Sequence, residues 1–309
     1  AAAAAGHTLL IGLVLAAVVA YLNAMASAQL ATAYPTSGGT YVYGRERLGE
    51  WWGFTAGWGF VVGKTASAAA MALAFAAYVV PAPGLAQRLV AALAVLALGG
   101  VNVLGVQRTA WVTAVLVALT LASLMLVILV GWPGTGQGLP SLACLVCVGN
   151  WYGTLQSAGL LFFAFAGYAR IATLGEEVVD PRRTIPRAIL LALAITVVVY
   201  AAIGVATLSA LGPERLAAST APLRDVMVAA GFGALAPVVQ VGAALASLGA
   251  LLTLMAGIAR TVLAMGRNQD LPGWLATVHP RFSTPHHAEL VLAGVIAVVA
   301  LATDLRNAI

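Results

Sequence analysis

Eight apolar stretches, each long enough to form a membrane-spanning helix, account for most of this 309-residue sequence. About 20 apolar residues in a helix cross the roughly 30 Å hydrocarbon layer of a bilayer. Inside that layer every backbone N–H and C=O needs an internal partner, which favours helices for runs of this length. The expected spans are residues 9–34, 52–80, 89–106, 110–132, 155–174, 188–211, 235–265 and 290–305.

The composition indicates an all-α polytopic membrane protein. Hydrophobic residues make up 62% of the chain and charged residues only 8%, whereas soluble domains carry about 25% charged residues. The loops are too short for a soluble domain, so we expect a single transmembrane domain over residues 1–309. The basic residues behind the net charge of +5 are scattered among the spans, without the basic stripe that nucleic-acid binding requires.

The placement of arginine predicts the orientation of the chain. Loops after the first, third, fifth and seventh spans hold nine arginines when Arg260, near the end of the seventh span, is counted with them, against four in the other loops and the C-terminal end. Arginine-rich loops stay in the cytoplasm, which places both chain ends outside. An outside start is unusual without a basic signal-peptide region. A missing preceding helix would remove this difficulty, so we expect a trimmed or fragmentary chain.

The fifth span carries a glycine, Gly167, and then a charge, Arg170, where hydrocarbon is expected. Irregular backbone and charge at membrane depth survive where protein or a water-filled cavity receives them, so this stretch is a candidate binding site. The alternative is a continuous helix in which Gly167 is a packing notch and Arg170 extends toward the headgroups.

Lys64 is the most informative single residue of the second span. It lies 12 residues past Trp52, about 18 Å along a helix, and hence near mid-membrane. No acidic residue lies deep in any expected span, so its partner is a carbonyl, water, an absent helix or a bound carboxylate. We expect Lys64 to bind the substrate or to take part in proton coupling; the alternative is a structural lysine.

Three stretches resemble the amino acid–polyamine–organocation (APC) superfamily of permeases. They are AQLATAYPTSGGTY at 28–41, GEEVVDPRRTIPRA at 175–188 and AMGRNQDLP at 264–272. The resemblance implies a fold of two inverted five-helix repeats, in which the spans here correspond to family helices two to nine. The first helix, the tenth and those after it are then missing from the chain.

The resemblance also implies substrate binding where the family's sixth helix is broken. That break corresponds to Phe163, Phe165, Ala166, Gly167 and Tyr168, with Phe163 as an aromatic lid. Freed backbone groups at such a break bind the charged ends of a substrate. Many family members carry an acid two residues after the glycine. This chain has Ala169 there, which disfavours cationic substrates.

Two further groups of residues are candidates for coupling and gating. Thr120 and Thr253 lie where the resemblance suggests a small cation site, although a threonine in a helix also bonds back to its own carbonyls. The last group is an expected inner gate, in which two arginines offset the charges of two glutamates at a helix end. It consists of Glu176, Glu177, Arg182 and Arg183.

The sequence contains no nucleophile elbow, paired carboxylates or phosphate loop, so we expect no enzyme. Cys144 and Cys147 lack two further zinc ligands, and no metal or cofactor is expected. We predict a secondary transporter of the plasma membrane that moves an amino acid by alternating access, in symport with a proton or by antiport. The alternatives are an amino-acid sensor on the same scaffold and a non-functional fragment without the first helix.

Overall fold

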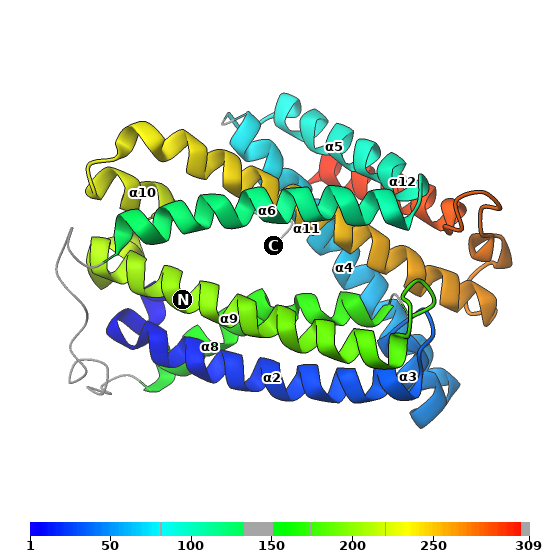
Figure 1. Cartoon of the computed structure of the whole chain (residues 1–309). Helices are drawn as coiled ribbons and strands as arrows, with labels where there is room; N and C mark the ends of the chain where they lie inside the picture. The colour runs from blue at the N-terminus through cyan, green and yellow to red at the C-terminus, as the bar shows by residue number, and fades with distance from the viewer. Residues whose placement is uncertain (81, 133–150, 174, 220, 304–309) are drawn as a thin grey trace. The chain divides into compact units, whose positions relative to one another are not determined.

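A computed structural model describes residues 1–80, 82–132, 151–173, 175–219 and 221–303 (Figure 1). The described chain is built from α-helices and short 3₁₀ segments, the latter labelled η. The elements are α1 (Ala2–Ala5), η1 (Gly6–Thr8), α2 (Leu9–Ala33), α3 (Thr40–Leu48), α4 (Glu50–Val79), α5 (Leu85–Val103), α6 (Val106–Gly131), α8 (Trp151–Phe165), η2 (Ala166–Thr173), α9 (Pro181–Ala218), α10 (Pro222–Ala229), η3 (Gly233–Leu235), α11 (Ala236–Arg267), η4 (Gly273–Ala276) and α12 (His286–Ala302).

The expected spans coincide with these helices, which confirms a polytopic all-α membrane protein. Among the described residues, seven helical segments are long and apolar enough to cross a membrane, with mean hydropathy between 1.2 and 2.8. The eighth expected span corresponds to α12, which is shorter. The sixth ends as expected at Leu211, because Gly212 within α9 takes a non-helical φ of 71° that a residue with a side chain rarely adopts.

Contacts divide the chain into two compact units. The first unit contains Ala1–Ala26, Leu121–Tyr168 and Arg187–Gly242, and the second contains Ser27–Thr120, Ala169–Pro186 and Ala243–Ile309. Several helices continue from one unit into the other, so the division does not follow the loops. A single transmembrane domain over the whole chain stays a prediction.

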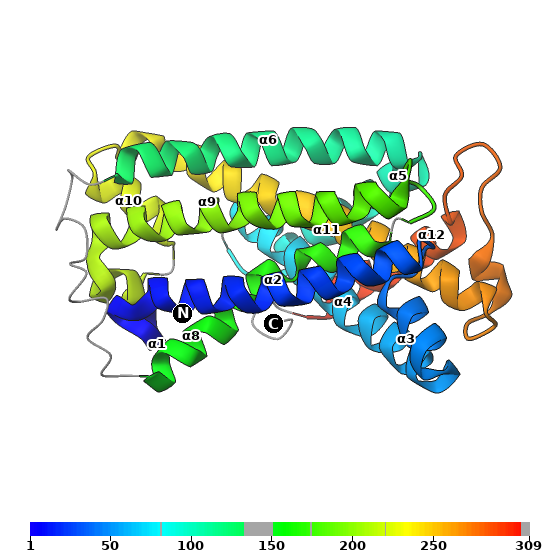
Figure 2. The same cartoon turned by 60° about the horizontal axis from the view of Figure 1, so that its bottom comes forward.

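The core of the first unit gathers around fully buried Val226 and Met227 of α10. α1 lies along α8 in this unit (Figure 2). Beside this contact, the hydroxyls of Thr8 and Thr154 are 2.6 Å apart and hydrogen bonded. Hydroxyl pairs of this kind join helices where lipid provides no hydrophobic driving force.

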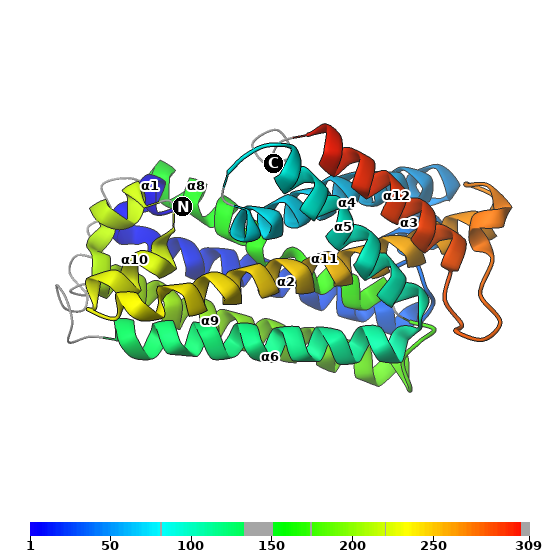
Figure 3. The ribbon, with the colours of Figure 1, turned by 90° about the horizontal axis from the view of Figure 1, so that it is seen from above.

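The core of the second unit forms where α4, α5 and α12 pack together, with α5 beside α12 in Figure 3. Fully buried Val95 of α5, Ile296 of α12 and Met255 of α11 belong to this cluster. α3 packs against α4 at very short range, since a Cβ on Gly53 would lie 2.8 Å from Arg45 Cα. Small residues permit such close approach of helices in membranes.

Candidate functional site

The backbone changes its hydrogen-bonding pattern at the position expected from Gly167. α-Helical bonding ends at Phe165, and residues Ala166–Thr173 continue as the 3₁₀ segment η2. A 3₁₀ turn bonds to the third residue rather than the fourth, and its geometry is poorer than that of an α-helix. The interruption is thus confirmed, and it takes the form of a tightened segment rather than an unwound loop.

Two aromatic residues of the predicted lid region differ in their surroundings within the first unit. The side chain of Phe163 is 69% exposed, whereas Phe165 is 4% exposed. The ring of Phe165 lies 5.2 Å from that of Tyr200, and Tyr200 Oη donates to the carbonyl of Ala164 at 3.4 Å. Tyr200 therefore supports the last turn of α8, a role that the sequence did not reveal. The role of Phe163 as a lid stays a prediction.

Two cations meet close to the interruption, within the second unit. Arg170 Nη1 donates to Thr253 Oγ1 at 3.0 Å, and Lys64 of α4 is near enough for the two charges to repel. Neither cation pairs with an acid among the described residues, and Arg170 Nε is buried without a hydrogen-bond partner there. Uncompensated cations in an apolar setting favour an anionic ligand group.

The two threonines expected at a cation site both bond back to their own helices. Thr120 donates to the carbonyl of Leu116 at 2.8 Å, and Thr253 donates to that of Gly249 at 3.0 Å. Thr253 also accepts from Arg170, so a cation already contacts this hydroxyl. Coupling-ion binding by the two threonines stays a prediction.

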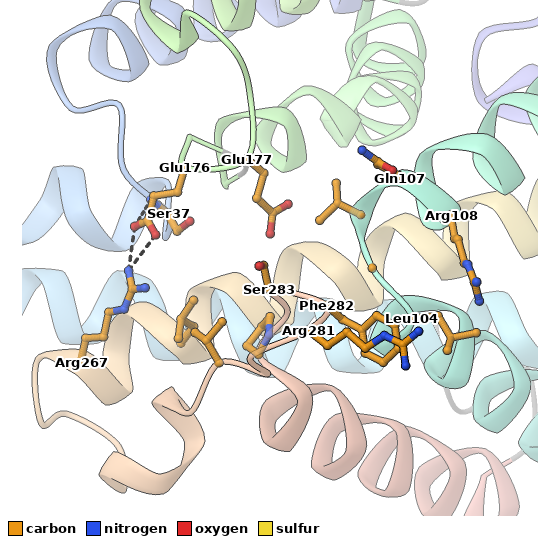
Figure 4. Close-up of a pocket in the computed structure, with 15 residues that line it drawn as sticks. Ser37, Leu104, Gln107, Arg108, Glu176, Glu177, Arg267, Arg281, Phe282 and Ser283 are labelled. Atoms are coloured by element: carbon orange, nitrogen blue, oxygen red, sulfur yellow. Dashed lines mark hydrogen bonds and ion pairs between the residues drawn. The ribbon is translucent and has the colours of Figure 1, made fainter.

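An open cleft of about 720 Å³ lies beside the GEE sequence in the second unit (Figure 4). At one side of it Glu176 forms an ion pair, with Arg267 Nη1 at 2.7 and 2.9 Å from the two carboxylate oxygens. The backbone N–H of Ser37 donates to the same carboxylate at 3.2 Å. Other residues of the cleft lining are Gln107, Arg108, Glu177, Arg281, Phe282 and Ser283.

The partners expected for the two glutamates were wrong. Glu176 pairs with Arg267 and Glu177 with Arg260, both from α11, instead of with Arg182 and Arg183. Arg183 is 78% exposed and lies 3.9 Å from Asp180. α9 begins at Pro181, directly after the turn at Asp180, and this change of direction leaves the side chain of Arg183 in the open.

A buried acid–base cluster adjoins this ion pair. Arg260 holds Glu177 through Nε at 3.0 Å and Nη2 at 3.3 Å, and it holds Glu289 through Nη1 at 2.7 Å. The side chain of Arg260 is 2% exposed, that of Glu177 15% and that of Glu289 0%. Sequence reasoning missed the cluster because it counted Arg260 among loop residues. The available signal was the spacing of Arg260 and Arg267, two turns apart on one helix face.

The first and third motif stretches contact one another through Tyr41 and Asp270. Tyr41 Oη donates to Asp270 Oδ2 at 2.6 Å, and Arg45 Nη1 donates to the same oxygen at 2.9 Å. Burial, together with the hydrogen bond to Asp270, raises the pKa of Tyr41 to about 12. The phenol therefore stays protonated and serves as a donor at physiological pH.

Cys144 and Cys147 lie outside the described residues.

Comparison with known proteins identifies close similarities over nearly the whole chain. The family described as amino acid permease matches residues 1–308. An uncharacterized transporter of Mycobacterium tuberculosis is 57% identical over 309 residues, which cover all of this chain and 69% of that protein. The branched-chain amino acid permease BcaP of Bacillus subtilis is 26% identical, covering 93% of this chain and 66% of the relative. The Asc-type amino acid transporter 1 of Mus musculus is 32% identical, and the match covers 93% of this chain and 56% of that protein.

Proposed function

This chain belongs to the amino acid permease family, and from that premise we propose a secondary active transporter that moves amino acids across the plasma membrane by alternating access. The observation that carries the proposal is the end of α-helical bonding at Phe165 inside an apolar span. The 3₁₀ bonds that replace α-helical pairing have poorer geometry, so backbone groups here are more readily recruited by the charged ends of a small solute. The same segment presents Arg170 near Lys64.

The charges support an amino acid with a free carboxylate and no net positive charge. Lys64 and Arg170 form no ion pair with described residues, so a substrate carboxylate would relieve their repulsion. The residue two places after Gly167 is alanine instead of an acid, which removes the natural partner of a cationic side chain. The name of the related BcaP refers to branched-chain amino acids, which are also zwitterionic.

The cleft beside Glu176 and Arg267 fits a cytoplasmic gate. Arginine placement puts this end of α11 on the cytoplasmic side, and the ion pair bridges two segments that are 91 residues apart in sequence. Partly exposed pairs contribute at most about 1 kcal/mol, so such a gate can open at little cost. Coupling to a proton or to exchange of a second amino acid completes the proposed cycle.

Uptake and binding measured side by side test this function. The protein in liposomes is expected to accumulate radiolabelled neutral amino acids when an inward proton gradient or an internal amino acid is supplied. Equilibrium binding of the same amino acid is measured on the same preparation in detergent. Binding without uptake would identify a sensor and contradict the transport function, and the absence of both would contradict a functional amino acid site.

A further inference from the structure

The cluster of Arg260, Glu177 and Glu289 has no part in the cycle proposed above. It contains two carboxyl groups and one guanidinium, in a place where all three side chains are at most 15% exposed. Glu289 is fully buried, and its Oε2 has no hydrogen-bond partner among the described residues. With both acids ionised the buried cluster would carry a net negative charge, which is costly in an apolar interior.

A proton on Glu289 removes that excess charge. Its Oε1 already accepts from Arg260 Nη1, so Oε2 is the atom that carries the proton. The charged groups that face this carboxyl are Arg260 from α11 and Glu177 from the segment before α9. From α5 the neutral Asn102 also faces it, and Asn102 Nδ2 donates to the carbonyl of Leu252 at 3.3 Å. α4 and η4, which also pack against α12, add no charged group from the described residues.

We propose that Glu289 is a proton-binding site whose occupancy depends on the ion pair between Glu177 and Arg260. The two carboxylates compete for one guanidinium. While Glu177 is paired with Arg260, Glu289 shares that guanidinium with Glu177 and retains its proton. When Glu177 leaves, Arg260 is the one charged group among the described residues that still faces Glu289, and the carboxyl releases the proton to water. By linkage, protonation of Glu289 favours the state in which Glu177 is engaged.

The position of Glu177 makes it the member of the cluster that can move. It lines the open cleft next to Glu176, as Figure 4 shows, and it lies on the short segment between η2 and α9. Glu177 is 15% exposed, whereas Arg260 and Glu289 are 2% and 0% exposed, so Glu177 is the member of the cluster that solvent reaches. The position of the segment just after η2, which carries Glu177, is thus coupled to the protonation of Glu289. This proposal rests on the proposed transport function, for which it supplies the coupling proton.

Infrared spectroscopy of the purified protein tests the proton site without any substrate. The C=O band of a protonated carboxyl group is followed while the pH is raised. The wild type is expected to retain such a band near neutral pH, and E289Q is expected to lose it. Glu50 is the matched control, because its side chain is 84% exposed and also pairs with an arginine, Arg45. E50Q is expected to keep the band. An E289Q titration identical to that of the wild type would overturn the proposal.

A second variant covers the case in which E289Q does not fold. E177Q keeps Glu289 and removes the competing charge, so the pH at which half of the band is lost should fall by about one to two units. An unshifted titration would overturn the coupling between the two carboxyls.

Transport then serves as a separate readout. Uptake by E289Q in liposomes is expected to be insensitive to an imposed proton gradient, and a response like that of the wild type would contradict the coupling role. A wild-type protein that transports no amino acid but shows the titrating band would count against the transport function alone.

Discussion

Arg170 Nη1 donates a hydrogen bond to Thr253 Oγ1 over 3.0 Å, which fastens the 3₁₀ segment η2 to α11. This contact joins the interrupted backbone to a helix that begins more than 60 residues later in the chain. A guanidinium whose Nη1 is held in this way points its other donors in a fixed direction. Thr253 therefore helps to set the orientation of the Arg170 guanidinium, and with it the proposed contact to a substrate carboxylate.

Replacement of Thr253 by valine is expected to lower uptake about ten- to hundredfold, since a hydrogen bond to a charged group contributes about 1.5–3 kcal/mol. Thr196→Val is the control, because Thr196 also bonds back to its helix, at the carbonyl of Ala192, and donates to no charged group among the described residues. Initial uptake rates in liposomes provide the measurement. Losses that simply add in the Thr253→Val, Arg170→Gln double variant would show that the two residues act independently.

Lys64→Met is expected to reduce uptake of a zwitterionic amino acid more than tenfold, mainly through a higher KM. The substitution keeps the length of the side chain and removes the charge that a carboxylate would pair with. Arg224→Met is the matched control, because Arg224 lies exposed on α10. Transport by Lys64→Met at the rate of the wild type would refute the proposed role in substrate binding or proton coupling.

Tyr41 and Tyr43 provide a matched pair on α3. Tyr41→Phe removes the donor to Asp270 and is expected to lower the free energy of unfolding by about 1.5–3 kcal/mol. Tyr43→Phe is expected to be neutral or stabilising, because the Tyr43 hydroxyl is buried without a partner among the described residues. Chemical denaturation in detergent measures both. Equal losses for the two variants would show that the bond to Asp270 is not what stabilises α3.

The same tyrosine predicts a dependence of stability on alkaline pH. The pKa of Tyr41 is raised from 10.0 to about 12 in the folded protein. A raised folded pKa means that the contribution is fully present below pH 10 and is lost as the pH rises toward 12. The difference in stability between wild type and Tyr41→Phe should therefore shrink over that interval.

The sequence predicted the helices well and the long-range ion pairs poorly. Apolar length fixes where a helix crosses a membrane, and the glycine followed by Arg170 marked the interruption, since both are local properties. The partners of Glu176 were assigned to neighbouring arginines because short spacing was the only available guide. In the folded chain α11 brings Arg267 to within 2.7 Å of Glu176, and no local pattern encodes that proximity.

The buried cluster was missed for a related reason. Arg260 and Glu289 lie near the ends of apolar segments, where charges are normally solvated, so a count of charges treats them as loop residues. Only packing shows that both are buried and that they lie 2.7 Å apart. A contact between two helices is a property of the fold and not of either segment.

The gate is tested by exchange of charges between Glu176 and Arg267. Glu176→Arg alone is expected to lower uptake by about two- to fivefold, since a partly exposed ion pair contributes up to about 1 kcal/mol. The double variant Glu176→Arg, Arg267→Glu should recover most of that loss. Recovery stays incomplete because Ser37 N–H loses its acceptor in both variants. Arg183→Glu, at an exposed position, is the control. A double variant no better than the single one would rule out a role for the ion pair.

Gly167→Ala tests whether the interruption itself is needed. Among the described residues of its own unit, no atom lies within 4 Å of a Cβ built on Gly167, so alanine fits there without a clash. Alanine favours the α-helix over glycine by about 1 kcal/mol, which opposes the 3₁₀ segment. Uptake should fall about fivefold, through a higher apparent Kd, while thermal stability is unchanged or higher.

Gly175→Ala separates this backbone effect from simple steric damage. A Cβ there would lie 2.7 Å from the carbonyl oxygen of Thr36 and 2.8 Å from the carbonyl carbon of Pro35, all within the second unit. Backbone atoms cannot move aside as a flexible side chain would, so this variant is expected to lose folded protein and activity together. The two glycines thus predict opposite patterns: Gly167→Ala loses transport with the fold intact, and Gly175→Ala loses both. Normal uptake by Gly167→Ala would mean that substrate binding does not use the interrupted backbone.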